Sequence, residues 1–417
     1  GGESDTPEAL ALFVTYLPMC AAAVLLVVLS ASERGRGWQV VVGGLVMATV
    51  LFPLAACWAW GAGWLSRLGH SMSLGHGYVD HAGSGVVYFL GGMAALGALV
   101  GLGGRTPRTP EGHVEEMPPV HFPLLANLGA LLFGLGTMGW SLAVPFHVAG
   151  AQLNLPRIAA NGLLAGGGAV LASQFYCWLT IGHADALMAA RGMAAGFVIV
   201  AGGAPFMPAW AALIAGVVAG IVLPLGIYLV DRVARLPDQT GAVALGAIVG
   251  VLGLLLVPLS ADGRWGQGWN GIGPTEYRNV LDQGVTGMFP PEPFSPDGQG
   301  QALAQLAGIG ALGGFGFLIS YLVFLLLGLP YRPRVARPVR QATPATLATD
   351  LPAGEAEEET APATEPQHER RGLLRIFDLA RLKPSQEAPA EDAPSDEAEA
   401  APDDPSVAAD DQDAGEL

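Results

Sequence analysis

Long apolar runs alternate with short polar loops through the first 330 residues of the chain. A helix needs about 20 apolar residues to cross the hydrocarbon core of a bilayer, and runs of that length recur along this region. The pattern predicts an all-α, polytopic membrane protein, a helical bundle with about nine transmembrane helices. The predicted spans are residues 9–30, 39–62, 82–102, 122–146, 156–180, 184–203, 207–231, 239–259 and 301–329.

Small residues recur at three- and four-residue spacing within these spans. The segments NGLLAGGGA (161–169) and AGVVAG (215–220) show this pattern clearly. Small side chains let helix backbones approach closely in lipid, where burial of apolar surface does not drive helices together. Residues 1–330 are therefore expected to form one transmembrane domain of closely packed helices.

The composition changes after residue 330. Overall, 51% of the residues are hydrophobic and 13% are charged, which is typical of a membrane protein. From residue 341 onward the chain holds 20 of its 36 acidic residues and 5 of its 20 basic residues, so almost all of the net charge of −16 belongs to this region. Residues 331–417 are expected to be an acidic, disordered cytoplasmic tail, because they contain too little apolar surface to fold.

One segment of the tail differs from the rest. The sequence RRGLLRIFDLARLK (370–383) places apolar side chains near one helical face and basic side chains around it. A short amphipathic helix of this kind can lie on anionic lipid or dock on a cytoplasmic protein partner. A transient helix with no partner is the open alternative.

Arginines in the loops indicate the orientation of the chain. Basic residues accumulate in cytoplasmic loops, and the loops on one side of the predicted bundle hold ten arginines against four on the other. The bias predicts an N-terminus outside and a C-terminus in the cytoplasm, in the cell (inner) membrane. The ten are Arg34, Arg36, Arg105, Arg108, Arg232, Arg235, Arg332, Arg334, Arg337 and Arg340; the four are Arg67, Arg157, Arg264 and Arg278.

Cysteine and histidine usage argues against a disulfide framework or a metal site. Cys20, Cys57 and Cys177 each lie in an apolar run, where they act as small hydrophobic residues. Several histidines are expected in the outer loops, but their spacings match no standard ligand pattern. They are His70, His76 and His147, with Asp80 and His81 nearby in sequence.

The loop 260–300 contains a GxGxxG pattern at Gly266, Gly268 and Gly271. A dinucleotide site needs a strand before this pattern and a helix opening at it, and neither is predicted here. The loop is expected to form a tight lid over the ends of the helices. The apolar core shows no nucleophile and base pair, so an enzyme is disfavoured, and the acidic tail disfavours binding of nucleic acid.

Six segments resemble, in order and spacing, motifs of the ammonium transporter (Amt/Mep/Rh) family. The resemblance covers about residues 10–330 and implies the fold of that family: helices arranged as an inverted repeat, one pore in each subunit, and a homotrimer that transports ammonium or ammonia. The segments are SASERGR (30–36), WAWGAGWL (58–65), VDHAGSGVVY (79–88), LFGLGTMGW (132–140), NGLLAG (161–166) and ADGRWGQGWNGIG (261–273).

The resemblance also marks departures. The chain starts at the family's third helix, so two helices are expected to be missing, by truncation or by nature. The family places two histidines side by side in the pore, where imidazole can accept and donate protons near neutral pH. Tyr88 stands at the first of these positions and the second falls near Val243, while no histidine occurs between His183 and His368.

The outer binding site of the family is partly retained. Trp60 maps to the tryptophan that offers its ring face to a cation, whereas Met19 and Ala143 map to the aromatic gate and His147 to the serine of the site. Replacing a gate ring by Ala143 should widen the vestibule. Trp140 ends the matching helix motif and joins this set of candidate substrate-binding residues.

Asp80 and His81 open the helix that carries Tyr88. A carboxylate at a helix start accepts backbone N–H groups, and direct attraction of a cation by Asp80 is the open alternative. His81 replaces an aromatic residue of the family and is expected to be a water-exposed interfacial residue.

Two functions are consistent with the sequence. The first is transport of ammonium or ammonia through a narrow apolar pore, with capture at Trp60 and Asp80 and with proton coupling or selectivity unlike the rest of the family. The second is a non-conducting sensor or scaffold that signals through its cytoplasmic tail. No cofactor is expected for either function.

Overall fold

The computed structural model describes residues 6–32, 34–103, 122–143, 153–236 and 238–329. These residues all belong to one compact unit of the chain. The acidic tail, its expected helix at 370–383 and the candidate residue His147 lie outside the described residues.

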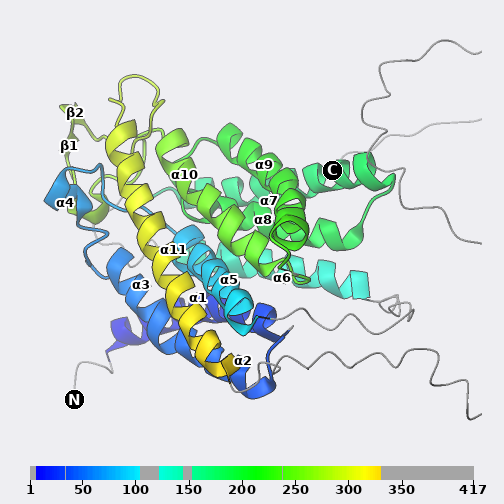
Figure 1. The fold of residues 1–417 in the computed structure, drawn as a ribbon. Coiled ribbons are helices and arrows are strands. Elements are labelled where there is room, and N and C mark those ends of the chain that lie inside the picture. Colours follow the sequence, from blue (N-terminus) through cyan, green and yellow to red (C-terminus); the bar gives the residue numbers. More distant parts are fainter. Residues whose placement is uncertain (1–5, 33, 104–121, 144–152, 237, 330–417) are drawn as a thin grey trace, which may run out of the picture. The chain divides into compact units, whose positions relative to one another are not determined.

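The described residues form an almost wholly helical bundle (Figure 1), which confirms the all-α, polytopic architecture. Four of the helices contain a π-helical segment, labelled η1, η2, η4 and η5, whereas η6 is a short 3-10 helix. The elements in chain order are α1 (Pro7–Ser32), α2 (Gly37–Val46), η1 (Met47–Leu51), α3 (Phe52–Ala59), α4 (Leu68–Met72), η2 (Ser84–Phe89), α5 (Leu90–Leu102), α6 (Phe122–Ala143), α7 (Leu155–Ile181), α8 (Ala186–Ala201), α9 (Ala209–Tyr228), η4 (Leu229–Val233), η5 (Ala244–Val249), α10 (Gly250–Ser260), η6 (Trp269–Gly271), β1 (Glu276–Tyr277), β2 (Val280–Leu281) and α11 (Gly298–Gly328).

Seven helices of the described part are long and apolar enough to cross a membrane. Two further apolar helices, Ala186–Ala201 and Ala244–Ser260, are shorter. Each of the nine predicted spans contains one of these helices, but the count of nine transmembrane helices is not confirmed. The seven long spans are Ala9–Ser32, Gly37–Ala59, Ser84–Leu102, Phe122–Ala143, Leu155–Ile181, Ala209–Val233 and Gly298–Gly328.

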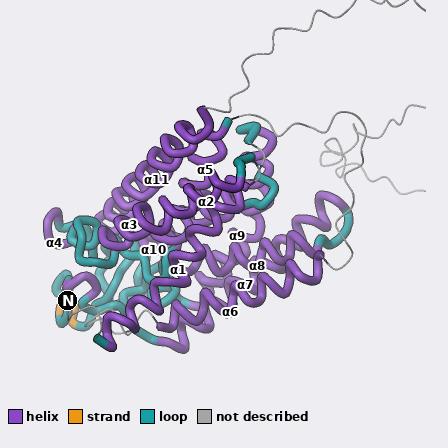
Figure 2. The backbone as a smooth tube through the Cα atoms, turned by 90° about the horizontal axis from the view of Figure 1, so that it is seen from below, coloured by secondary structure: helices purple, strands orange, loops and turns teal. Residues whose placement is uncertain are grey.

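The continuous helix of η2 and α5 lies at the centre of the described bundle. It packs against α1, α11 and η5, and 78% of its span is buried, compared with 17% for α6. A second group of helices consists of α6, α7, α8 and α9, which contact one another and run side by side in Figure 2. The centre of the bundle is therefore built around the segment that follows Asp80.

Close approach of backbones explains the small residues that the sequence repeats. A Cβ atom added at Gly101 of α5 would lie 2.7 Å from the backbone oxygen of Tyr321 in α11. One added at Gly316 of α11 would lie 2.9 Å from the oxygen of Leu90 in α5. Since such separations are shorter than van der Waals contact, larger side chains would push these helices apart.

Two buried aspartates begin two helices in the same way. Asp80 precedes η2 and α5, and Asp238 precedes η5 and α10. Each carboxylate accepts hydrogen bonds from three successive or nearly successive backbone N–H groups at the start of its helix. The two π-helical turns η2 and η5 pack on each other. The described fold thus contains a repeated helix-start device whose two copies meet at its centre.

The long loop between α10 and α11 carries the GxGxxG glycines. All three have positive φ values, 87° at Gly266, 74° at Gly268 and 76° at Gly271, which side chains other than hydrogen rarely tolerate. Trp269 is buried and packs edge-on against Phe206, with ring centroids 5.2 Å apart. Figure 1 shows the β1–β2 hairpin of this loop and α4 at the same end of the bundle. The loop covers the helix ends there.

Candidate functional site

A cavity of about 390 Å³ opens beside the start of the central helix. Its walls come from α1, the end of α3, the segment around α4, His81 and the loop that contains η6. The candidates Met19 and Trp60 both line it. The lining residues are Thr15, Tyr16, Met19, Ala59, Trp60, Ala62, Ser66, Arg67, His70, His81, Trp269, Asn270 and Gly271.

Two aromatic rings form one wall of this cavity. Tyr16 stacks on Trp60 with ring centroids 5.6 Å apart and an interplanar angle of 24°. The indole N–H of Trp60 donates to the backbone oxygen of Asp80 at 2.7 Å, which fixes the ring in place. The faces of such rings attract small cations. Tyr16 is a cavity residue that the family motifs do not mark, although it stands three residues before Met19 and so shares a face of the same helix.

Asp80 is buried and serves the backbone of the central helix. Its carboxylate accepts hydrogen bonds from the N–H groups of Gly83 at 3.1 Å, Gly85 at 3.0 Å and Val86 at 2.8 Å. Burial raises the pKa of Asp80 to about 6, and these backbone N–H groups oppose the rise. Among the described residues that line the cavity, Asp80 is absent. Its geometry thus supports the helix-start role more directly than contact with a cation.

The expectation that His81 is exposed to water is wrong. The side chain has no exposed surface, and its Nε2 atom lies 2.9 Å from the backbone oxygen of Ser141 in α6. The ring lies beneath the lid, near Trp269 and Phe206. Burial lowers the pKa of His81 to about 4, since a charged imidazole would lose its hydration there. His81 is buried because the loop that carries Trp269, which is distant in the sequence, packs over it.

Two buried histidines should make stability depend on pH. Burial lowers the pKa of His76 to about 3 and that of His81 to about 4, whereas both titrate at about 6.5 when unfolded. The unfolded chain therefore binds more protons between about pH 4 and 6.5, so the free energy of unfolding should rise with pH across this window. Burial raises the pKa of Asp80 to about 6, so this carboxyl group lowers the free energy of unfolding as the pH rises to about 6. The two histidines together outweigh this single group.

Unfolding in mixed micelles with increasing dodecyl sulfate, at a series of pH values, measures this dependence. His76→Gln should reduce the slope by up to about 1.4 kcal/mol per pH unit, the contribution of one proton. His183→Gln is the matched control because His183 is exposed, and its slope should equal that of the unchanged protein. A stability that is flat or falls from pH 4 to 6.5 would contradict the prediction.

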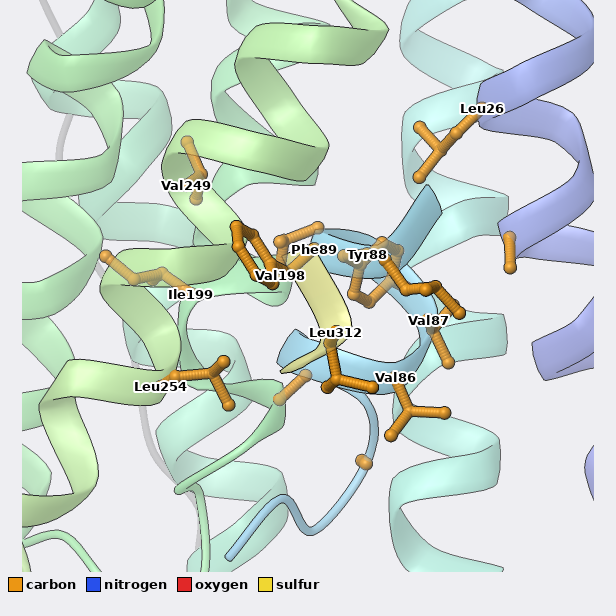
Figure 3. Close-up of a cluster of buried hydrophobic side chains, with 14 of the residues drawn as sticks. Leu26, Val86, Val87, Tyr88, Phe89, Val198, Ile199, Val249, Leu254 and Leu312 are labelled. Carbon is orange, nitrogen blue, oxygen red and sulfur yellow. The ribbon is translucent and has the colours of Figure 1, made fainter. Parts of the chain in front are cut away.

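Tyr88 is buried in the core of the described bundle. Its side chain is 1% exposed, and its hydroxyl lies 3.1 Å from Oγ1 of Thr137 in α6. Its ring lies 5.9 Å from that of Phe133 and 6.2 Å from that of Trp140. Figure 3 shows Tyr88 within a cluster of buried apolar side chains that includes Leu26 and Leu312.

Trp140 is the candidate that lies nearest to Tyr88 in the described core. It is buried, and its indole N–H donates to the backbone oxygen of Ala82 at 3.1 Å. The hydrogen bond ties α6 to the start of the central helix. Tyr88, Trp140 and Phe133 thus form an aromatic cluster between α6 and the start of the central helix.

The expected position of Ala143 in the vestibule is wrong. Ala143 instead lines a shallow groove with residues from the start of α7, such as Leu155 and Ala159. The buried face of α6 carries Thr137 and Ser141. Residue 143 follows at an angle that turns its side chain away from that face.

The expected position of Val243 opposite Tyr88 also requires correction. Val243 packs in a separate apolar cluster with Ala95 and Leu99. A Cβ atom added at Gly246 would instead lie 2.6 Å from the backbone oxygen of Tyr88. Tyr88 and Gly246 each stand eight positions after a helix-starting aspartate, Asp80 and Asp238. The repeated device therefore sets the register.

Comparison with known proteins identifies related sequences. A model of the Ammonium Transporter Family matches residues 2–337. Ammonium transporter Amt2 of Archaeoglobus fulgidus is 30% identical over 267 residues, which cover 64% of this chain and 56% of that protein. Ammonium transporter Amt1 of Haloferax mediterranei is 30% identical over 263 residues, which cover 60% of this chain and 50% of that protein. The chain thus spans about half the length of the curated relatives it matches.

Solved structures show the same fold. A structure described as a Sensor Amt Protein has a TM-score of 0.59 and 21% identity, and the match covers 76% of this chain and 71% of that one. Candida albicans Mep2 has a TM-score of 0.58 and 23% identity, with 74% of this chain and 62% of that one covered. At these identities the similarity concerns the fold alone.

Proposed function

Because the chain belongs to the ammonium transporter family, we propose that it carries ammonium or ammonia across a membrane through a pore in each subunit. The observation that supports this proposal is the cavity walled by the stacked rings of Tyr16 and Trp60. A small cation over such a face gains roughly 0.5–2 kcal/mol. Tyr88 does not line the cavity and is buried against Phe133 and Trp140; in this proposal its side chain moves aside during passage.

Topology and assembly form part of the same proposal. The arginine bias of the loops supports an outer N-terminus and a cytoplasmic C-terminus in the inner membrane. Family membership supports a homotrimer. The basic segment 370–383 within the acidic tail supports contact with anionic lipid or with a cytoplasmic protein. An enzymatic role is not part of the proposal.

The second candidate is a non-conducting sensor or scaffold that acts through the tail. The burial of Tyr88, whose hydroxyl lies 3.1 Å from Oγ1 of Thr137, is the observation that favours it. A sensor would use the cavity to bind its ligand and would not need an open lumen. The two candidates thus share the cavity and differ in whether Tyr88 ever leaves its position.

Ammonium-evoked current and internal pH change in liposomes distinguish the two candidates. The proposed transporter should give a saturable signal, and Trp60→Leu should raise the half-saturating concentration by about twofold to thirtyfold, the effect of losing one cation–π contact. Trp210→Leu is the matched control, because Trp210 is 66% exposed on α9, and it should leave the signal unchanged. A folded protein without any saturable signal would exclude transport and favour the sensor.

A further inference from the structure

Two residues that line the cavity each carry a buried polar atom without a hydrogen-bond partner among the described residues. These atoms are Nδ1 of His81 and Nε1 of Trp269. Both residues line the cavity, and their ring centroids lie 6.3 Å apart. Unpaired polar atoms inside a protein cost free energy and commonly pair with a bound water or ligand. The two atoms therefore indicate a binding position that the aromatic wall does not explain.

The surroundings of His81 determine which of its nitrogens carries hydrogen. The backbone oxygen of Ser141, 2.9 Å from Nε2, can only accept a hydrogen bond. Nε2 must therefore be the protonated nitrogen of the neutral ring, and Nδ1 keeps a free lone pair. Burial lowers the pKa of His81 to about 4, so the ring is neutral at pH 7. His81 thus presents an acceptor at Nδ1.

Trp269 supplies the opposite function. An indole N–H is a donor only, and the ring is fixed by its edge-on contact with Phe206 at 5.2 Å. His81 and Trp269 consequently present one hydrogen-bond acceptor and one hydrogen-bond donor on two rigid aromatic side chains. A ligand that satisfies both must carry an N–H or O–H group as well as a lone pair.

We infer that His81 and Trp269 form a second subsite, which binds ammonia in its neutral form. This subsite is separate from the cation-binding wall that Tyr16 and Trp60 form in the same cavity. Ammonia can donate to Nδ1 of His81 and accept from Nε1 of Trp269. The ammonium ion has no lone pair and cannot accept from Trp269, so it belongs at the faces of Tyr16 and Trp60. The identification of the ligand rests on the proposed function. Water has the same donor and acceptor pattern, and the test must distinguish the two.

The subsite is covered in the described conformation. His81 is 0% and Trp269 is 4% exposed. A ligand therefore reaches the pair only when the side chains around it move.

Nitrogen NMR of histidine-labelled protein in liposomes tests the subsite directly. The resonance of a bare imidazole nitrogen moves when the nitrogen accepts a hydrogen bond, and His81→Gln identifies the signal by its loss. Addition of ammonium chloride at pH 8 should shift the Nδ1 signal of His81 in a saturable way, whereas potassium chloride should not. A signal that ammonium chloride leaves in place would overturn the inference, since water alone would then occupy the position.

Transport measurements on the same protein separate this inference from the proposed function. His81→Phe keeps an aromatic ring and loses the acceptor, so the half-saturating ammonium concentration should rise about tenfold, the effect of one such hydrogen bond. His81→Gln can still donate to Ser141 and accept from a ligand, and should recover most of the loss. The matched control is His183→Phe, because His183 is exposed, and it should behave as the unchanged protein.

Each combination of the transport and NMR results leads to a different conclusion. Transport without an NMR shift would keep the function and overturn the subsite. An NMR shift without transport would support the subsite in a sensor and overturn the transport proposal. Absence of both would overturn both. Should His81→Phe fail to fold, the NMR measurement on the unchanged protein and the His81→Gln variant still decide the question.

Discussion

Asp80→Ala should lower the free energy of unfolding by at least about 3 kcal/mol, because three buried N–H groups lose their acceptor at about 1–3 kcal/mol each. Those groups belong to Gly83, Gly85 and Val86, all buried. The carboxylate also holds the start of the helix at the centre of the bundle. Loss of this anchor should therefore affect the whole fold. Unfolding in mixed micelles with increasing dodecyl sulfate measures the change.

Two further substitutions make this prediction specific. Asp80→Asn keeps one side-chain oxygen, which can still accept from Gly85 and Val86, so it should cost clearly less than Asp80→Ala. Asp185→Ala is the matched control, since the Asp185 carboxylate accepts one N–H at the start of α8, from Leu187 at 2.8 Å, and a single cap is worth about 1 kcal/mol. Equal costs for Asp80→Ala and Asp185→Ala would refute the anchoring role.

Tyr88→Ala should increase the rate of ammonium entry into liposomes about tenfold or more. The Tyr88 side chain is buried and is held by Thr137, Phe133 and Trp140. If moving this ring aside costs about 1.4 kcal/mol or more, its removal should raise the rate by at least that factor of ten. Stopped-flow measurement of internal pH after an ammonium pulse gives the rate.

Tyr88→Phe is the control for this effect. This substitution keeps the aromatic ring in its place. It removes only the hydrogen bond to Thr137, which is worth about 0.5–1.5 kcal/mol. Its rate should accordingly change less than that of Tyr88→Ala. A Tyr88→Ala protein that folds, binds ammonium and remains impermeable would show that the interior is closed elsewhere, and would favour the sensor.

Asp80 and Asp238 begin two helices in a similar way, and the sequence position of each predicts which residues meet further along. Both aspartates stand just before an apolar run in the sequence, but only Asp80 lies within one of the family motifs. The structure shows that both carboxylates accept hydrogen bonds from the N–H groups five and six residues further along the chain. Counting eight residues from each gives Tyr88 and Gly246, which are in contact. Counting from Asp238 would have placed the second position at Gly246 from the sequence alone.

The membrane-spanning pattern and the cavity residue Trp60 followed from the sequence, because apolar runs and short motifs are local properties of the chain. A run of about 20 apolar residues can satisfy its backbone in lipid only as a helix. The place of Asp80 at a helix start is local for the same reason, since its partners lie within six residues of it.

Contacts between distant segments decided the rest. Tyr16 joins Trp60 because α1 packs beside the end of α3, and His81 is buried because the lid that carries Trp269 closes over it. Ala143 turns outward because the rotation of α6 is set by Thr137 and Ser141 at its buried face. Helix rotation and loop packing depend on which surfaces meet in three dimensions, and no periodicity within one segment specifies them.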